Sequence, residues 1–555
     1  MKIALLQINA RLAQPEANGR VIEAAYQEAV GRGAEMVVSP ELAVPGYMPG
    51  DRLLEPAMRR RIEIESHRLK AIAGSVPLVF GTCSPSDSGK LWNELWWCEN
   101  GNLRSVTRKS HVEHNEGRYF EPCSTLQEPV AHLDKKVAFA IGENTHGHCE
   151  SLVRAGATLI VNVAAGTCAL GSFVPDGRFP SWALPSKSAQ RCTFLSNISK
   201  TCAVPVAYIN RVGAEGSHLF DGGSCLSLPD GTFQCFDDFG DGVFIVDTAL
   251  QGAAWSSKDG KPNEGAWLRR ALALGLKDNI SKQCIEAVVV GLSGGIDSAV
   301  VAALAAETLG PQKVLGVALP TRYTSAESTG LAMAQASKLG IHYLEINADA
   351  PFAGAAESML RSLPGRQFGL TDENLQCRCR GMLLMGLTTE PAVHRMFGTS
   401  GCAVLNTGNK SEAATGYFTL YGDGVGAFGI LGDLLKARVY ALARELGGSV
   451  PTEVVSRPPT AELRPNQTDE SSLLPYRQLD AILGALIEAS RPMDGLHDDL
   501  ADVLDGQDLL EAREALPRVQ RLISGTEFKR RQAPFALKVT HKTFGLDTNV
   551  PLTAV

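Results

Sequence analysis

The sequence lacks most of the features that would set it apart from an ordinary globular protein. No apolar run approaches the ~20 residues of a membrane-spanning helix, and Met1 to Asn9 turn polar too soon for a signal peptide. The net charge of −7 argues against a general nucleic-acid binder. The 13 cysteines form no Cys-x-x-Cys pair, so neither a disulfide framework nor a zinc site is indicated. We therefore expect a cytoplasmic protein without membrane or nucleic-acid partners.

The length of the chain predicts more than one domain. At 555 residues it exceeds the size at which a single core keeps growing. Residues 251–265 are rich in Gly, Ser, Asp and Lys and are typical of a linker. We expect a first domain over residues 1–250 and a second over residues 266–555, with the boundary near residue 260.

A glycine-rich turn in the second domain predicts an anion site. Val288 to Val290 indicate a short buried strand, and Ala299 to Leu309 indicate a helix. Between them lies Ser293-Gly294-Gly295-Ile296-Asp297-Ser298, which presents backbone N–H groups at the positive end of that helix. No Gly-Lys-Ser/Thr follows the glycines, so the turn is not a Walker A loop.

The rest of the second domain alternates between strands and helices. Strands are predicted at residues 314–319, 343–346 and 403–405, with polar turns after the first and the last. This alternation predicts a parallel, doubly wound sheet whose ligands lie beyond the carboxyl ends of the strands.

The first domain also alternates in an α/β pattern and carries two short motifs. Glu41 lies in Pro-Glu-Leu, shortly before Pro-Gly-Tyr, and Lys109 lies in Thr-Arg-Lys-Ser-His. These motifs resemble the carbon–nitrogen hydrolase (nitrilase) superfamily. The resemblance implies an αββα sandwich and a Glu–Lys–Cys catalytic set, in which the Cys thiolate attacks an amide. Glu41 matches the base and Lys109 the lysine. The nucleophile position is Gly142, in Gly-Glu-Asn where the family has Cys-Glu-Asp.

The missing thiol predicts that covalent glutamine hydrolysis is absent or very weak. Cys149 and Cys168 are the nearby alternatives, but free cysteines are usually small apolar fillers. The segment between Lys109 and Arg118 is also shorter than in glutamine-using relatives. We interpret Glu41 and Lys109 as remnants of a glutaminase-type site.

The Ser293–Ser298 turn of the second domain is accompanied by further motifs at residues 406–412, 416–423, 457–465, 467–470 and 527–532. The turn resembles the loop of ATP pyrophosphatases (adenine nucleotide alpha-hydrolase-like), and together these motifs resemble the long-form NAD⁺ synthetase family. The resemblance implies that ATP·Mg²⁺ adenylates deamido-NAD⁺, that pyrophosphate leaves, and that ammonia or glutamine nitrogen then gives NAD⁺. It also implies a homo-oligomer.

The resemblance assigns the site residues of the second domain. The matches to the pyrophosphate and ATP contacts are Gly291, Leu292, Ser293, Gly294, Gly295, Ile296, Asp297, Ser298, Thr407, Lys436 and Thr460. Asp297 and Glu412 match the Mg²⁺ carboxylates, which are hard oxygen ligands suited to that ion. The matches to the deamido-NAD⁺ contacts are Asn374, Arg378, Glu412 and Lys529.

Several alternatives stay open at this point. Free ammonia is the expected nitrogen donor, and glutamine use through a displaced cysteine or a partner is the first alternative. Amidation of a different carboxylate is the second, and a non-catalytic regulatory protein is the third. Arg378 and Arg380 also fit a solvated helix face, and residues 387–402 have no assigned role.

Overall fold

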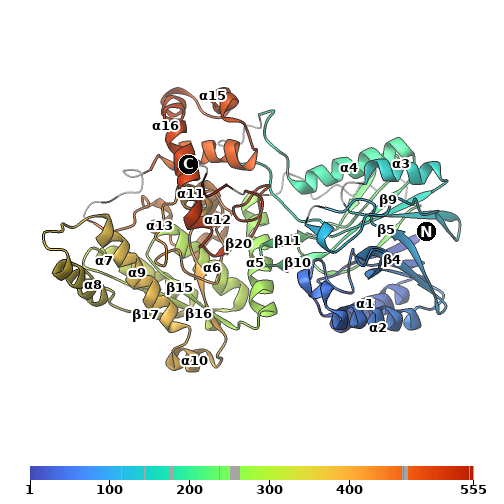
Figure 1. Cartoon of the computed structure of the whole chain (residues 1–555), viewed down its shortest axis with the longest axis horizontal. Helices are drawn as coiled ribbons and strands as arrows, with labels where there is room; N and C mark the ends of the chain where they lie inside the picture. The colour runs from blue at the N-terminus through green and yellow to red at the C-terminus, as the bar shows by residue number, and fades with distance from the viewer. Residues whose placement is uncertain are drawn as a thin grey trace. The chain divides into compact units, whose positions relative to one another are not determined.

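The structure, a computed structural model, divides the described part of the chain into two units (Figure 1). The described residues are 1–113, 115–142, 145–174, 180–236, 238–249, 263–464, 467, 473–548 and 550–553. Unit 1 comprises Met1–Cys168, Lys187–Glu215 and Leu219–Lys261, and unit 2 comprises Ala169–Ser186, Gly216–His218 and Pro262–Val555. Two segments of the N-terminal half therefore belong to unit 2, which a single boundary near residue 260 does not capture. Most of the predicted linker, residues 251–262, lies outside the described residues.

Unit 1 contains two six-stranded sheets and a hairpin. The first sheet has the order β14 (Gly242–Asp247), β1 (Lys2–Gln7), β2 (Met36–Val38), β3 (Leu78–Pro85), β4 (Leu91–Glu99), β5 (Asn102–Arg108). The second has the order β13 (Phe233–Cys235), β12 (Cys225–Ser227), β9 (Val206–Asn210), β8 (Leu159–Ala164), β7 (Lys135–Ile141), β6 (Val130–His132). The hairpin is β10 (Val212–Glu215) with β11 (His218–Asp221).

Helices cover the outer face of each sheet, and the two inner faces pack against each other. Ile3 of β1 and Val137 of β7 share one buried cluster because alternate residues of a strand face opposite sides. Ala4 packs on the other side with α1 (Pro15–Gly31) and α2 (Pro56–Ile72). Ala138 packs with α3 (His146–Arg154) and α4 (Lys187–Cys202). Figure 1 shows the two helix pairs on opposite sides of the strands, which confirms the predicted αββα sandwich.

Unit 2 is built on one parallel sheet. Its order is β17 (His342–Glu345), β16 (Val314–Ala318), β15 (Ala287–Gly291), β18 (Cys402–Asn406), β19 (Phe428–Gly429), β20 (Phe535–Ala536). The chain runs outward from β15 through β16 and β17, and then continues on the other side of β15 with β18. The strand order therefore reverses between β15 and β18, the position where open α/β sheets bind ligands.

Helices pack around this sheet as expected for a doubly wound fold. One group is α5 (Glu264–Lys282), α6 (Ile296–Leu309) and α12 (Lys436–Leu446), which pack against one another. Further helices are α7 (Ala326–Leu339), α8 (Asp349–Ser362), α9 (Leu370–Leu387), α10 (Pro391–Phe397), α11 (Lys410–Thr415) and α13 (Thr452–Ser456). Leu387 of α9 and Val393 of α10 join Val289 of β15 in one core. The tract 387–402, which had no assigned role, thus includes a helix that closes this core.

A C-terminal helical group completes unit 2. It comprises α14 (Tyr476–Leu483), the π-helix η7 (Gly484–Glu488), α15 (Met493–Ala501), α16 (Gly506–Gly525) and α17 (Glu527–Arg530). Trp182, from the segment Ala169–Ser186, is buried in its core. Among the described residues, no helix combines the length and the apolar character needed to cross a bilayer.

Candidate active site

The glycine-rich loop after β15 closes on itself through two serine hydroxyls. Ser298 Oγ accepts a hydrogen bond from the Ser293 amide at 3.2 Å and lies 3.1 Å from Ser293 Oγ. Gly294 has a φ of +75°, and a Cβ there would lie 2.5 Å from the carbonyl oxygen of Ser328. Only glycine fits such a position. Because α6 begins at Ile296, the positive end of a 14-residue helix lies at this loop, as the anion site requires.

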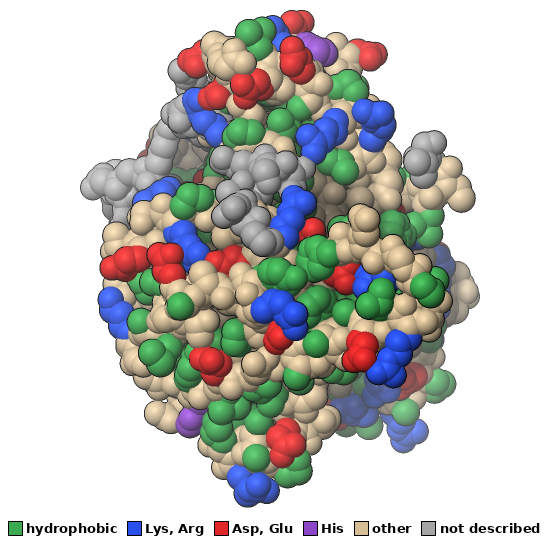
Figure 2. Space-filling model, turned by 90° about the vertical axis from the view of Figure 1, so that its left-hand side faces the viewer, with side chains coloured by type: hydrophobic (Ala, Val, Ile, Leu, Met, Phe, Trp, Pro, Cys, Tyr) green, Lys and Arg blue, Asp and Glu red, His purple; other side chains and the backbone are tan. Residues whose placement is uncertain are grey.

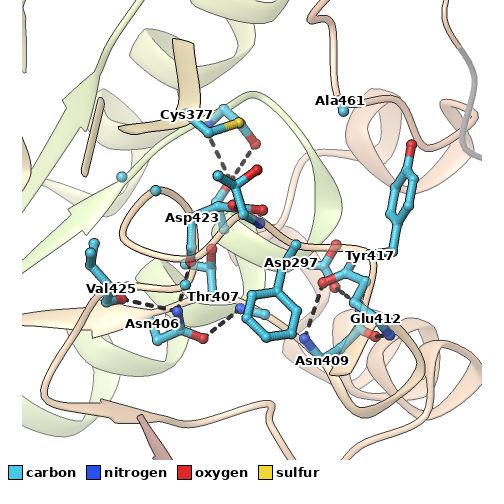
Figure 3. Close-up of a pocket in the computed structure, with 18 of the residues that line it drawn as sticks. Asp297, Cys377, Asn406, Thr407, Asn409, Glu412, Tyr417, Asp423, Val425 and Ala461 are labelled. Carbon is cyan, nitrogen blue, oxygen red and sulfur yellow. Dashed lines mark hydrogen bonds between the residues drawn. The ribbon is translucent and has the colours of Figure 1, made fainter. Parts of the chain in front are cut away.

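Two carboxylates and one ammonium group meet next to this loop. Lys436 Nζ lies 2.5 Å from Asp297 Oδ2 and 3.5 Å from Glu412 Oε1. Asn409 caps α11 and donates to Asp297 Oδ1 at 3.0 Å. Figure 3 shows Asp297, Asn409 and Glu412 gathered at one edge of the pocket. The group carries a net charge of −1, so it can accept a divalent cation or another positive group.

These residues line a cavity of about 990 Å³ at the carboxyl ends of the strands. Its wall also includes the predicted contacts Gly291, Leu292, Ser293, Gly295, Ile296, Ser298, Asn374, Thr407, Thr460 and Lys529. The structure therefore brings together residues that are up to 238 positions apart in the sequence, from Gly291 to Lys529. A site of this size holds a nucleotide-sized ligand.

Arg378 does not share the cavity wall with these residues. It borders a separate hollow, together with Cys379, Gly381, Met382, Met385, Tyr421 and Val425. Arg380, two positions further along α9, lines the large cavity instead. Its Nε donates to the Leu319 carbonyl oxygen at 3.0 Å, and its Nη2 lies 3.3 Å from Thr321 Oγ1. Arg380 is thus an anchored wall residue rather than part of a solvated helix face.

A carboxyl on the cavity wall, Asp423, lies near the predicted dinucleotide contacts. Asn374 Oδ1 accepts a hydrogen bond from Thr419 Oγ1 at 2.7 Å, and the Thr419 amide donates to Asp423 Oδ1 at 2.7 Å. Desolvation by the surrounding cavity wall raises the pKa of Asp423 above its ordinary value, although the residue is exposed to the cavity. Within a glycine-rich turn, Asp423 looks like an ordinary turn residue in the sequence, and its place on the cavity wall separates it from one.

Lys529 approaches the same part of the cavity from the C-terminal segment. Its Nζ donates to the carbonyl oxygens of Gly416 and Phe418 at 2.8 and 2.7 Å. Burial lowers the pKa of Lys529 below its ordinary value. The structure thus places Lys529 inside the site, and not in a surface run of basic residues.

Two loops supply the predicted threonines. Thr407 follows β18 beside Asn406. The side-chain amide nitrogen of Asn406 donates hydrogen bonds to the carbonyl oxygens of Asp423 and Val425 (Figure 3). Thr460 Oγ1 donates to the Gln467 carbonyl oxygen at 2.6 Å and so closes its own loop. Residues 468–470 of the matching stretch lie outside the described residues.

Unit 1 contains a second, smaller cluster of buried charges. Lys109 Nζ lies 2.8 Å from Glu41 Oε1 and 2.8 Å from Glu116 Oε1. Asn93 and the Ala165 amide also donate to Glu41, at 2.7 and 3.0 Å. Burial raises the pKa of Glu41, and Lys109 opposes that shift. Sequence reasoning found Glu41 and Lys109 but missed Glu116, because that residue lies in the segment that departs from the family pattern.

Gly142 lies at the end of β7 beside Lys109. A Cβ built on Gly142 would lie 3.3 Å from Lys109 Cε and 3.8 Å from its Nζ. Position 142 therefore faces the charged cluster but carries no side chain. Cys149 lies in α3, where its thiol is 3.7 Å from Thr145 Oγ1 and burial raises its pKa to about 11. Burial also raises the pKa of Cys168 well above its ordinary value.

Comparison with known proteins supports both halves of this description. The chain matches the carbon-nitrogen hydrolase family over residues 2–254 and the NAD synthase family over residues 268–533. A glutamine-dependent NAD(+) synthetase from Synechocystis sp. is 32% identical, with 99% of this chain and 98% of the relative covered. One from Xanthomonas campestris is 34% identical, with coverages of 94% and 91%. The solved structure of a glutamine-dependent NAD+ synthetase from Acinetobacter baumannii in complex with ADP is 26% identical, with a TM-score of 0.72 and coverages of 99% and 98%.

The match runs through both units and reaches relatives over nearly their whole length. It also explains why one chain combines a nitrilase-like sandwich with a cavity at the reversal point of a parallel sheet. The chain belongs to the NAD⁺ synthetase family, and it is a ligase that forms carbon–nitrogen bonds.

Proposed function

We propose that the protein uses ATP to adenylate the nicotinate carboxylate of deamido-NAD⁺ and that free ammonia then displaces AMP to give NAD⁺. A carboxylate is a poor electrophile, and attachment of AMP supplies the leaving group that an amine can displace. The protein then has to position two anionic substrates and neutralise the charge that develops between them. The Asp297–Glu412–Lys436 group, at the positive end of α6, supports this role.

The residues around the loop suit the departing pyrophosphate. Lys436 is buried and supplies a positive charge next to the N-terminus of α6, where phosphate oxygens are stabilised. Asp297 and Glu412 would hold Mg²⁺, which neutralises phosphate charge when bound. Among the described residues, no group of three or more acidic, His or Cys side chains forms a metal cage. A two-carboxylate set still fits, because Mg²⁺ usually binds one or two carboxylates together with substrate phosphates.

The other end of the cavity suits the acceptor dinucleotide. Lys529 offers a positive charge there, and Asn374 and Asp423 offer hydrogen-bonding groups beside it. Arg378 remains a predicted contact of the acceptor, although it borders a different hollow from these three residues.

The choice of nitrogen donor rests on one observation, the absence of a side chain at Gly142. Covalent glutamine hydrolysis by a nitrilase-like site needs a thiolate next to the Glu–Lys pair. Position 142 faces Lys109 and has no side chain, so we infer that unit 1 supplies no ammonia. Glutamine dependence is the second candidate, and the Synechocystis and Xanthomonas relatives, both glutamine-dependent NAD(+) synthetases, favour it.

A donor exchange with purified protein tests these two candidates. Deamido-NAD⁺, ATP and Mg²⁺ are combined with ammonium chloride, with glutamine, or with neither, and NAD⁺, AMP and pyrophosphate are quantified by mass spectrometry. We expect NAD⁺ with ammonium chloride and only traces with glutamine. Equal rates with both donors would overturn the ammonia proposal and support glutamine use. No product with either donor would favour another acceptor acid or a non-catalytic protein. Light scattering on the same sample tests the predicted homo-oligomer.

A further inference from the structure

Four fully buried charges lie behind the cavity, and the reaction as described does not use them. Lys410 Nζ lies 2.9 Å from Asp433 Oδ1 and 3.1 Å from Glu488 Oε1. Arg438 Nη1 lies 3.0 Å from the other oxygen of Glu488. None of the four side chains is more than 1% exposed. Burial raises the pKa of Glu488, but Arg438 and Lys410 outweigh that effect and lower it below its ordinary value.

The two cations of this group sit on the helices that carry the ATP-site charges. Lys410 is two positions before Glu412 on α11, and Arg438 is two positions after Lys436 on α12. Successive side chains of a helix point in different directions, so Glu412 and Lys436 line the cavity while Lys410 and Arg438 meet Glu488 behind it. A displacement of Glu488 would therefore reach both helices.

A short segment of the N-terminal half completes this group. We call residues 169–174 the strap; they belong to unit 2. The Phe173 amide donates to Glu488 Oε2 at 2.9 Å, and Arg438 Nη2 donates to the Gly171 carbonyl oxygen at 2.6 Å. The Arg438 guanidinium also lies 5.6 Å from the centre of the Phe173 ring. Gly484 permits this contact, because a Cβ there would lie 2.7 Å from the Phe173 carbonyl oxygen.

We propose that the strap and Glu488 form a positioning device that holds Glu412 and Lys436 in place for ATP. A buried carboxylate is stable only when each of its oxygens is paired, and removal of one partner leaves an uncompensated charge. Glu488 would then move toward its remaining cations and shift α11 and α12 with it. The N-terminal half of the chain thereby serves the synthetase reaction directly, whether or not it supplies ammonia.

Gly484→Ala is the sharpest perturbation of the strap. Gly484 has helical backbone angles (φ −60°, ψ −45°), so alanine suits its conformation, and the clash is with the Phe173 carbonyl oxygen. Gly495→Ala in α15 is the matched control, because its Cβ would meet nothing closer than Asp499 Oδ2 at 3.9 Å. Phe173→Pro removes the amide donor, whereas Phe173→Ala keeps it.

The assay measures NAD⁺ formation with ammonium chloride as donor, with ATP and deamido-NAD⁺ varied separately. We expect Gly484→Ala and Phe173→Pro to lower kcat/KM for ATP about tenfold, within the range of energetic coupling between contacting groups. The KM for deamido-NAD⁺ should stay within twofold. The kcat/KM for ATP of Gly495→Ala should match that of the unmodified enzyme. Phe173→Ala should lower kcat/KM for ATP less than Phe173→Pro does. A loss of stability would instead reduce the amount of active enzyme, and so lower the rate with both substrates alike. The difference between ATP and deamido-NAD⁺ therefore separates positioning from a loss of stability.

Two results would overturn the proposal. One is a kcat/KM for ATP within twofold of the unmodified enzyme in both Gly484→Ala and Phe173→Pro. The other is an equal loss for both substrates. If Gly484→Ala does not fold, the two Phe173 variants decide the question alone. The inference rests on the synthetase activity, so an unmodified enzyme without activity would refute the proposed function, whereas active but unaffected variants would refute only the positioning role.

Discussion

Replacement of Gly142 by cysteine tests whether the missing thiol is what separates unit 1 from a working amidase. The new Cβ would lie 3.8 Å from Lys109 Nζ, which places the thiol beside an ammonium group. A neighbouring positive charge favours the reactive thiolate. Glu41, 2.8 Å from the same Nζ, is then the candidate for the general base that the family resemblance assigns. We expect Gly142→Cys to react with an electrophilic glutamine analogue, and the unmodified protein not to react at position 142.

The structural cost of this substitution can be estimated from the backbone. Gly142 has a φ of +103°, where residues with a side chain are strained. Such strain costs about 1–3 kcal/mol, which corresponds to a loss of roughly 2–12 °C in Tm for a domain of this size. The 3.3 Å contact with Lys109 Cε requires only a small shift of a flexible side chain. Gly142→Ala carries the same strain without a thiol and is the matched control.

The assay compares glutamate release from glutamine by the unmodified protein, Gly142→Ala and Gly142→Cys, together with alkylation of the new thiol by iodoacetamide. We expect glutamate release only from Gly142→Cys, and faster alkylation of its thiol than of the buried cysteines. Glutamate release by the unmodified protein would refute the argument from the missing thiol. A folded Gly142→Cys whose new thiol reacts no faster than the buried cysteines would refute the placement of position 142 beside Lys109.

Three further predictions concern unit 2. Asp297→Asn should lower ammonia-dependent NAD⁺ formation at least ~100-fold and raise the Mg²⁺ requirement, because a preorganised charge is lost; a Mg²⁺ titration of the rate checks this. Lys529→Ala should raise the KM for deamido-NAD⁺ about tenfold while the KM for ATP stays constant, as initial rates will show. Burial raises the pKa of Asp480 to about 7. The same carboxyl ionises near pH ~4 in the unfolded chain, so it lowers the free energy of unfolding progressively as pH rises from ~4 to ~7 and causes no further change above that. Asp480→Asn should therefore gain in relative Tm across that window, and a constant difference from the unmodified protein would contradict the shift.

The sequence predicted the architecture of unit 2 well because its signals are local. Three β-branched residues before a Ser-Gly-Gly turn indicate a buried strand, and the structure has β15 there, although α6 begins at Ile296 rather than at Ala299. The positions of Arg378 and Arg380 could not be predicted in this way. They are two residues apart on one helix, so which one borders the cavity depends on the rotation of α9 against the sheet. That rotation is set by packing with distant residues such as Val289.

The buried networks were the least predictable part of the structure. Glu116 joins Glu41 and Lys109 through the fold of a segment that differs from the family pattern. Lys410 lies two positions before the predicted contact Glu412, yet its ammonium group is paired behind the cavity with Asp433 and Glu488. A charged residue next to a ligand motif can face either way, and its direction depends on partners more than 20 positions away.

Two segments of the N-terminal half suggest why the chain retains that half although position 142 carries no thiol. The strap and the turn at residues 216–218 lie within the carbon-nitrogen hydrolase match, yet both belong to unit 2. Ser217 lines the large cavity, and its carbonyl oxygen accepts a hydrogen bond from the Lys538 amide at 2.9 Å. Neither contact involves Gly142, which lies at the end of β7 beside Lys109. Loss of a nucleophile at position 142 therefore leaves these contacts in place, whereas removal of the whole N-terminal half would take part of the cavity wall with it.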